Sequence, residues 1–69
     1  MDSRDLWNNV KAELARRDVK RQHAERVMGV SPQTFKRRDD NPEDLRLGEV
    51  VSLMNYFGIP MSELTRGAR

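Results

Sequence analysis

The fold is decided by residues 19–39, which read VKRQHAERVMGVSPQTFKRRD. Gly29 suits the left-handed backbone conformation that ends many helices. Ser31-Pro32 is a strong helix start, because the serine side chain accepts from free amides of the next turn and proline at the first helical position lacks only an unneeded donor. The stretch therefore predicts a helix over residues 20–28, a short turn, and a second helix over residues 31–40 that a following proline ends.

One amphipathic helix is predicted before this unit and two after it. Residues 3–17, with Asp2 or Ser3 as N-cap, carry apolar residues at helical spacing, namely Leu6, Trp7, Val10 and Leu14. Residues 47–57 form the next predicted helix, whose expected buried residues are Leu47, Val50, Val51, Met54 and Phe57. A last short helix over about 61–66 carries Met61 and Leu64. The sequence thus predicts an all-α fold, a compact bundle of about five short helices.

The composition indicates one small globular domain over residues 1–69. A chain of 69 residues buries only about 60% of its unfolded surface, so a second domain is not expected. The lack of cysteine excludes disulfides and thiolate metal sites, and with a single histidine we expect neither a metal nor a cofactor. The absence of a long apolar run or a signal-like segment predicts a cytoplasmic protein without a membrane span.

Charge is distributed unevenly along the chain. Residues 1–38 hold ten Lys or Arg against five Asp or Glu, whereas residues 39–69 hold three against six. The positive charge is concentrated in residues 16–38, where eight basic residues stand against two acidic ones. Such a segment attracts a polyanion, although lysine and arginine also serve simply to solvate the outer faces of helices.

The central unit has the form of a DNA-binding motif. A short helix, a turn opened by glycine and a second short helix make up the helix-turn-helix, whose second helix enters the major groove. Residues 19–39 also resemble, without a gap, the phage repressor and Cro family of XRE-like regulators. The resemblance is carried by the turn Gly29-Val30-Ser31 and by the recognition-helix stretch Thr34-Phe35-Lys36-Arg37. It extends over about residues 5–65, and implies the lambda-repressor-like fold and a sequence-specific, double-stranded DNA-binding transcription regulator of phage or prophage type.

Four residues on the exposed face of the second motif helix are predicted to contact bases: Pro32, Gln33, Lys36 and Arg37. Gln33 and Arg37 lie one turn apart, and glutamine pairs bidentately with adenine as arginine does with guanine. Lys36 reaches either a base edge or a phosphate, and Pro32 offers apolar contact to a thymine methyl group. For each of them the alternative is an ordinary solvated side chain.

Phosphate contacts are expected at Arg21, Gln22, Ser31 and Thr34. The resemblance places Arg21 at the first turn of the preceding helix, where family members meet phosphate, with Gln22 beside it. Ser31 is expected to act both as helix cap and as phosphate donor. The expected partner is therefore operator DNA, with no small-molecule ligand.

A homodimer is expected as well, at least on DNA. Tyr56 falls opposite the apolar stripe of its helix, and with Ile59 and Met61 it could form the small apolar patch through which family members dimerise. Tyr56 could equally be a solvent-exposed side chain.

Some positions depart from the family pattern. Ala24 stands where the family usually has leucine, Glu25 where it has alanine, and Arg38 where it has a large apolar residue. One buried charge is costly, so we predict that Glu25 and Arg38 pair across the helix crossing, and that replacing Glu25 with alanine destabilises by more than about 1 kcal/mol. The acidic residues of 39–44 are expected to stay off the DNA backbone.

A second class of function stays open at this point. The modest net charge of +2 and the acidic segment 39–44 also suit a protein-protein interaction module, such as an antitoxin-like partner protein, that keeps the same fold. An enzyme is not expected, because no spacing suggests a nucleophile, a base and an orienting residue together. Replacing Arg37 discriminates the two classes, since it relaxes base preference only if bases are read.

Overall fold

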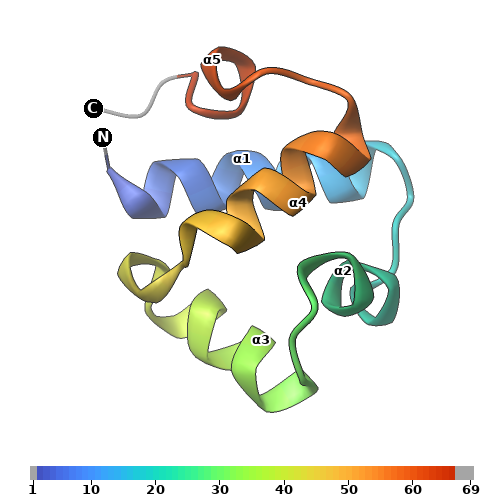
Figure 1. The fold of residues 1–69 in the computed structure, drawn as a ribbon, viewed down its shortest axis with the longest axis vertical. Coiled ribbons are helices and arrows are strands. Elements are labelled where there is room, and N and C mark those ends of the chain that lie inside the picture. The colour runs from blue at the N-terminus through green and yellow to red at the C-terminus, as the bar shows by residue number, and fades with distance from the viewer. Residues whose placement is uncertain (1, 67–69) are drawn as a thin grey trace.

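The computed structural model describes residues 2–66, and every regular element in this range is helical (Figure 1). The elements in chain order are α1 (Ser3–Arg16), α2 (Arg21–Met28), α3 (Pro32–Asp40), the single 3-10 turn η1 (Pro42–Asp44), α4 (Leu47–Phe57) and α5 (Met61–Leu64). The predicted all-α bundle of about five short helices is confirmed. The last helix ends at Leu64, earlier than predicted, and the outermost residues of the predicted 1–69 domain, 1 and 67–69, lie outside the described residues.

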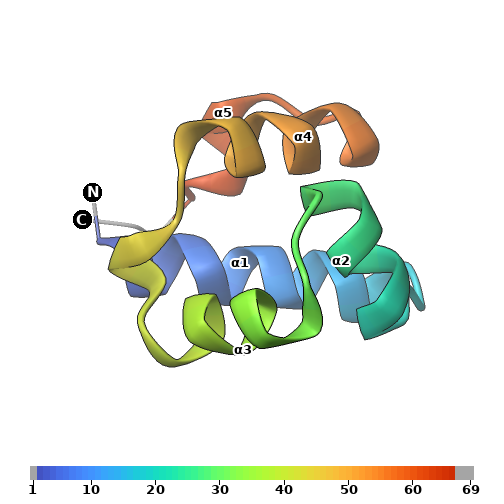
Figure 2. The same ribbon diagram turned by 60° about the horizontal axis from the view of Figure 1, so that its bottom comes forward.

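The helices are arranged around α1. In Figure 1, α4 crosses in front of α1, with α5 above and α2 and α3 below. Figure 2 places α3 along the lower edge of the molecule and α4 along the upper edge. The most extensive helix contact is between α2 and α4. No helix in residues 2–66 is long and apolar enough to cross a membrane.

A single apolar core joins all five α-helices. Its buried members are Leu6, Trp7, Val10, Leu14, Ala24, Met28, Phe35, Val50, Leu53, Phe57 and Leu64. Trp7 is fully buried, and the edge of one ring meets the face of the other where it packs on Phe35, with ring centroids 5.4 Å apart. The predicted core face of α1 is therefore confirmed, and α3 enters the core through Phe35.

The predicted buried stripe of α4 is wrong at two positions. Leu47 is 73% exposed and Val51 is 40% exposed. The helix instead buries Val50, Leu53 and Phe57, which recur at intervals of three and four residues and form one face. The apolar residues of this segment extend around more of the helix than its neighbours cover, so the sequence pattern alone did not select the covered face.

Local capping explains where the helices start and end. Asp2 caps α1 by accepting from the Arg4 N–H at 2.9 Å, and Ser31 caps α3 by accepting from the Thr34 N–H at 3.1 Å. Gly29 and Gly58 end α2 and α4 with φ angles of 72° and 69°, values that favour glycine because it has no Cβ. Gly29 and Ser31 thereby set the two ends of the turn between α2 and α3.

The C-terminal end of α3 is fixed to α1 by Asp39. The Trp7 Nε1–H donates to Asp39 Oδ1 at 2.8 Å, and the Lys11 ammonium lies 3.2 Å from the same oxygen. Arg4 adds a hydrogen bond to the Asp40 backbone carbonyl at 3.2 Å. Because the indole is fully buried, Asp39 also satisfies a donor that water does not reach.

We expect Asp39→Ala to lower the free energy of unfolding by about 1–3 kcal/mol, because it leaves the buried Trp7 N–H without an acceptor. Asp39→Asn keeps an acceptor oxygen and should cost less. Asp40→Ala, at the exposed neighbour, is the control and should change stability by no more than about 0.5 kcal/mol. Urea denaturation followed by tryptophan fluorescence measures all three, and equal losses for Asp39→Ala and Asp40→Ala would contradict the assignment.

A second polar contact fixes α3 to α4. Arg38 donates from Nε to Glu49 Oε1 at 3.0 Å and from Nη2 to Glu49 Oε2 at 3.2 Å, and both side chains are about nine-tenths buried. Glu49 also accepts from the Arg46 N–H at 3.0 Å, which satisfies the start of α4.

The predicted pairing of Glu25 with Arg38 is wrong. Glu25 instead binds Arg21, one turn earlier on α2, at 3.1 Å, because Glu49 lies within bidentate reach of Arg38.

Both anchoring carboxylates have a lowered pKa. The hydrogen bond from Trp7 is the main cause for Asp39. For Glu49, burial acts to raise the pKa, but the hydrogen bonds from Arg38 and from the Arg46 backbone, together with their positive charges, outweigh it. The hydrogen bond to Glu49 in turn raises the pKa of Arg38. A lowered carboxyl pKa means that folding favours the charged form, so the two contacts stabilise the fold most at neutral pH.

We expect acid to weaken the fold in a defined range. The contribution of Asp39 and Glu49 is fully present above the pKa of unfolded carboxyls, about 4, and is lost as the pH falls through the lower values of the folded state. Glu49→Gln should destabilise by about 3 kcal/mol or more at pH 7, because Arg38 stays buried without a counter-charge, and should flatten the acid dependence. Thermal unfolding between pH 7 and pH 2 measures both effects.

Two further variants keep this test decisive. Glu63→Gln replaces an exposed glutamate and should retain the acid dependence of the natural chain. The double variant Arg38→Met with Glu49→Leu removes both charges and should be more stable than Glu49→Gln alone. A Glu49→Gln variant as stable as the natural chain would refute a structural role for the pair.

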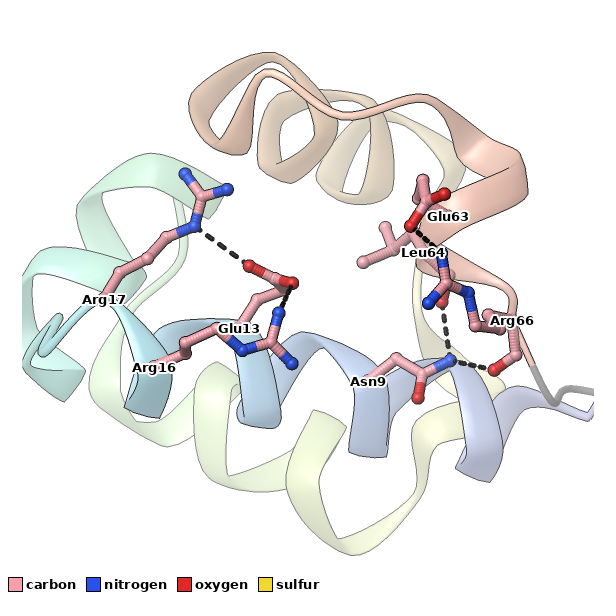
Figure 3. Close-up of polar contacts among 7 residues, drawn as sticks. All are labelled: Asn9, Glu13, Arg16, Arg17, Glu63, Leu64 and Arg66. Carbon is pink, nitrogen blue, oxygen red and sulfur yellow. Dashed lines mark hydrogen bonds and ion pairs between the residues drawn. The ribbon is translucent and has the colours of Figure 1, made fainter.

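The last helix is tied to the first by one amide side chain. Asn9 on α1 donates from Nδ2 to the backbone carbonyls of Leu64 at 2.8 Å and of Arg66 at 2.6 Å (Figure 3). Leu64 itself is buried in the core. The figure also shows Glu13 between Arg16 and Arg17, and the ion pair of Glu63 with Arg66. The two hydrogen bonds of Asn9 hold the end of α5 against α1, on the side of α1 away from α3.

Candidate nucleic-acid interface

The four residues predicted to contact bases lie on one exposed surface of α3. Pro32, Gln33, Lys36 and Arg37 are all exposed, whereas Phe35 on the opposite side of the helix is buried. Gln33 and Arg37 are four residues apart in a continuous helix, so their side chains are neighbours on this surface. The structure therefore brings the predicted base-contacting residues together, with donor and acceptor groups free to meet a partner.

The two cations of this surface differ in their local partners. Lys36 lies 3.6 Å from the Asp40 carboxylate, one turn further along α3, and both side chains are exposed. Arg37 forms no ion pair with any residue of the range 2–66. An exposed pair such as Lys36 and Asp40 is weak. Arg37 is therefore the cation of this surface with no competing carboxylate.

The first turn of α3 carries the next two predicted residues. The Ser31 hydroxyl accepts from the Thr34 N–H at 3.1 Å and donates to Thr34 Oγ1 at 3.0 Å. A hydroxyl has a single proton, so Ser31 uses its donor inside the cap while Thr34 keeps its own. Between the two phosphate candidates, the geometry favours Thr34 as the donor and Ser31 as the cap.

Arg21 and Gln22 open α2 beside this turn. Both are exposed, and the Arg21 guanidinium reaches across to donate to the Pro32 carbonyl at 3.2 Å. The cap residue of α2 is Lys20, which makes no side-chain capping bond. The Arg21 guanidinium thus lies at the joint between α2 and α3, next to the surface predicted to contact bases.

Three exposed cations were not singled out from the sequence. Lys20, Arg26 and Arg46 are exposed and form no ion pair with other described residues. Lys20 directly precedes the predicted phosphate residues Arg21 and Gln22, and this adjacency was the signal that could have identified it. Arg46 stands at the start of α4, where charge patterning gave no signal.

The acidic segment is divided by the fold. Asp39 is turned toward α1, where Trp7 and Lys11 bind it, while Asp40, Glu43 and Asp44 are exposed. The exposed acids follow the C-terminal end of α3, and the predicted base-contacting residues begin at its N-terminal end. Negative charge is therefore concentrated at one end of the candidate interface.

The three predicted dimer residues do not share one environment. Tyr56 is 40% exposed, and its ring centroid lies 5.3 Å from that of His23 on α2. Ile59 and Met61 are half-buried and pack against the core. Tyr56 is thus the exposed member of the three, and the exposed apolar side chains of α4 also include Leu47 and Val51.

Comparisons with known proteins add no assignment to this interface. No protein-family model matches the chain, and searches of curated proteins and of solved structures found no significant match. Within residues 2–66, no cluster of three or more His, Cys, Asp or Glu side chains is placed to hold a metal ion. The candidate interface is therefore defined by its own geometry and charge.

Proposed function

We propose that the chain is a sequence-specific, double-stranded DNA-binding transcription regulator that reads the major groove with α3. The observation that carries the proposal is the outer surface of α3, where Gln33 and an uncompensated Arg37 lie side by side on a helix held at its far end by Asp39 and Arg38. An α-helix fits the major groove, and these two side-chain types pair bidentately with adenine and guanine. The likeness of residues 19–39 to the repressor and Cro family supports the same function.

The surroundings of α3 suit contact with the DNA backbone. Arg21, Gln22 and Thr34 present donors beside its first turn, and Lys20 adds a free cation. Such contacts fix the register of a protein on the duplex, while base contacts supply discrimination of about 1–3 kcal/mol for each good bidentate pair. The proposed mode of action is occupation of the DNA site.

We expect selection from random duplexes to enrich a defined sequence, and Arg37→Ala to relax the preference at one G·C pair by about 1–3 kcal/mol. Arg26→Ala removes an exposed cation of α2 without touching the α3 surface, and should leave base preferences unchanged. Sequencing of retained duplexes for the natural chain and both variants checks this. Absence of enrichment for the natural chain would refute the proposal and would favour the alternative of a protein-interaction module.

The regulator is proposed to bind as a homodimer. The nine residues of α3 span about 14 Å, enough for one half-site, whereas half-sites of two-fold operators are about 34 Å apart. Residues 50–62 contain no charged residue, and two exposed apolar side chains of α4, Leu47 and Val51, lie one turn apart on the same side of the helix, whereas Tyr56 lies on the other side. Two copies can meet there without burying a charge.

We expect Val51→Glu to prevent assembly of two copies on a duplex with two half-sites, while binding to a single half-site persists. Glutamate is a good helix former, so the exposed site should tolerate it in the monomer. Ala15→Glu, at an exposed position of α1, is the matched control. Sedimentation velocity of the complexes gives the stoichiometry, and a two-to-one complex with Val51→Glu would exclude this face as the dimer contact.

A further inference from the structure

The Arg21 guanidinium is held at the joint between α2 and α3 by three contacts. Its Nε donates to Glu25 Oε2 at 3.1 Å, and its Nη2 donates to the Pro32 carbonyl at 3.2 Å. Its central carbon lies 4.9 Å from the centroid of the Phe35 ring, over the face of that ring. One side chain of α2 thus touches both the first backbone carbonyl of α3 and the residue by which α3 enters the core.

These contacts leave the guanidinium partly open to an outside ligand. The Arg21 side chain is 54% exposed. A guanidinium has five N–H donors in a planar fork, and the two hydrogen bonds to Glu25 and Pro32 use two of them. The same group can therefore hold α3 and donate outward to a phosphate oxygen at the same time.

The position of these contacts couples them to base reading. Pro32 directly precedes Gln33, and Phe35 is the one buried apolar residue of α3. A displacement of the guanidinium therefore moves the start of α3, on which the base-contacting side chains stand. A lysine at this position would supply the charge, but not the planar fork whose Nε and Nη2 reach Glu25 and Pro32 together while its carbon lies over the Phe35 ring.

We infer that Arg21 is a positioning residue for base discrimination: it binds backbone phosphate and α3 together, and so sets the register in which Gln33 and Arg37 meet the bases. The inference rests on the proposed function and extends it, because it assigns control of sequence preference to a side chain that touches no base. A residue that only contacts phosphate would weaken binding equally for all sequences.

The test compares Arg21→Lys with Lys20→Gln, using the duplex selected by the natural chain and its single-base-pair variants. Arg21→Lys keeps the charge, so the salt dependence should persist while discrimination at the pairs read by Gln33 and Arg37 falls by about fivefold or more. Lys20→Gln removes an adjacent cation, and should weaken binding to all duplexes equally and reduce the salt slope by about 0.9 if Lys20 meets phosphate. Full discrimination by Arg21→Lys would overturn the inference and leave the proposed function standing.

A measurement without DNA separates the two proposals further. The Thr34 and Phe35 amides donate to Ser31 Oγ and to the Ser31 carbonyl, so hydrogen exchange at these amides reports order in the first turn of α3. Exchange there should be several-fold faster in Arg21→Lys than in Lys20→Gln, with unchanged exchange at the buried residues of α1. Equal exchange in the two variants would overturn the positioning role, whereas absence of any selected duplex for the natural chain would overturn the proposed function.

Discussion

The fold depends on how a helix with one buried apolar side chain is held in place. α3 contributes only Phe35 to the core, and burial of a single aromatic residue is a small driving force for a nine-residue helix. Polar contacts at its C-terminal end supply the rest: Asp39 binds Trp7 and Lys11 of α1, and Arg38 binds Glu49 of α4. Because Arg38 and Asp39 are consecutive, the C-terminal end of α3 is fixed both to α1 and to α4.

This arrangement links the core to the candidate interface. Trp7 both fills the core against Phe35 and donates to Asp39, so packing and hydrogen bonding orient α3 together. At the other end of α3, Arg21 closes the joint with α2. Because α3 is held at both ends, its outer face needs no contact with the rest of the protein and stays exposed. That face carries Gln33 and Arg37. The exposed surface is thus a consequence of where the contacts lie.

Much of the secondary structure could be predicted from the sequence, because the start, the end and the buried face of a helix depend on residues that are close in the chain. The structure follows three local signals. They are the start of α3 at Ser31-Pro32, the ends of α2 and α4 at Gly29 and Gly58, and the apolar face of α1 formed by Leu6, Trp7, Val10 and Leu14. Contacts between distant residues were not predictable in this way. Glu25 and Arg38 suggested one pair, but Glu25 binds Arg21, which lies four residues earlier on the same helix and was within reach of the sequence pattern. Only the partner of Arg38, Glu49, depends on the packing of α3 against α4. The exposure of Leu47 and Val51 likewise depends on which side of α4 its neighbours cover.

The bare side of α3 also has a consequence for how such a protein can diverge. Pro32, Gln33, Lys36 and Arg37 are exposed and lie outside the core, so replacing them changes little of what keeps the chain folded. In the proposed function, selection for a new DNA target can therefore act on these positions almost independently of selection for stability. A small chain built in this way is an adaptable scaffold, in which recognition can be rewritten over one surface while the interior stays the same.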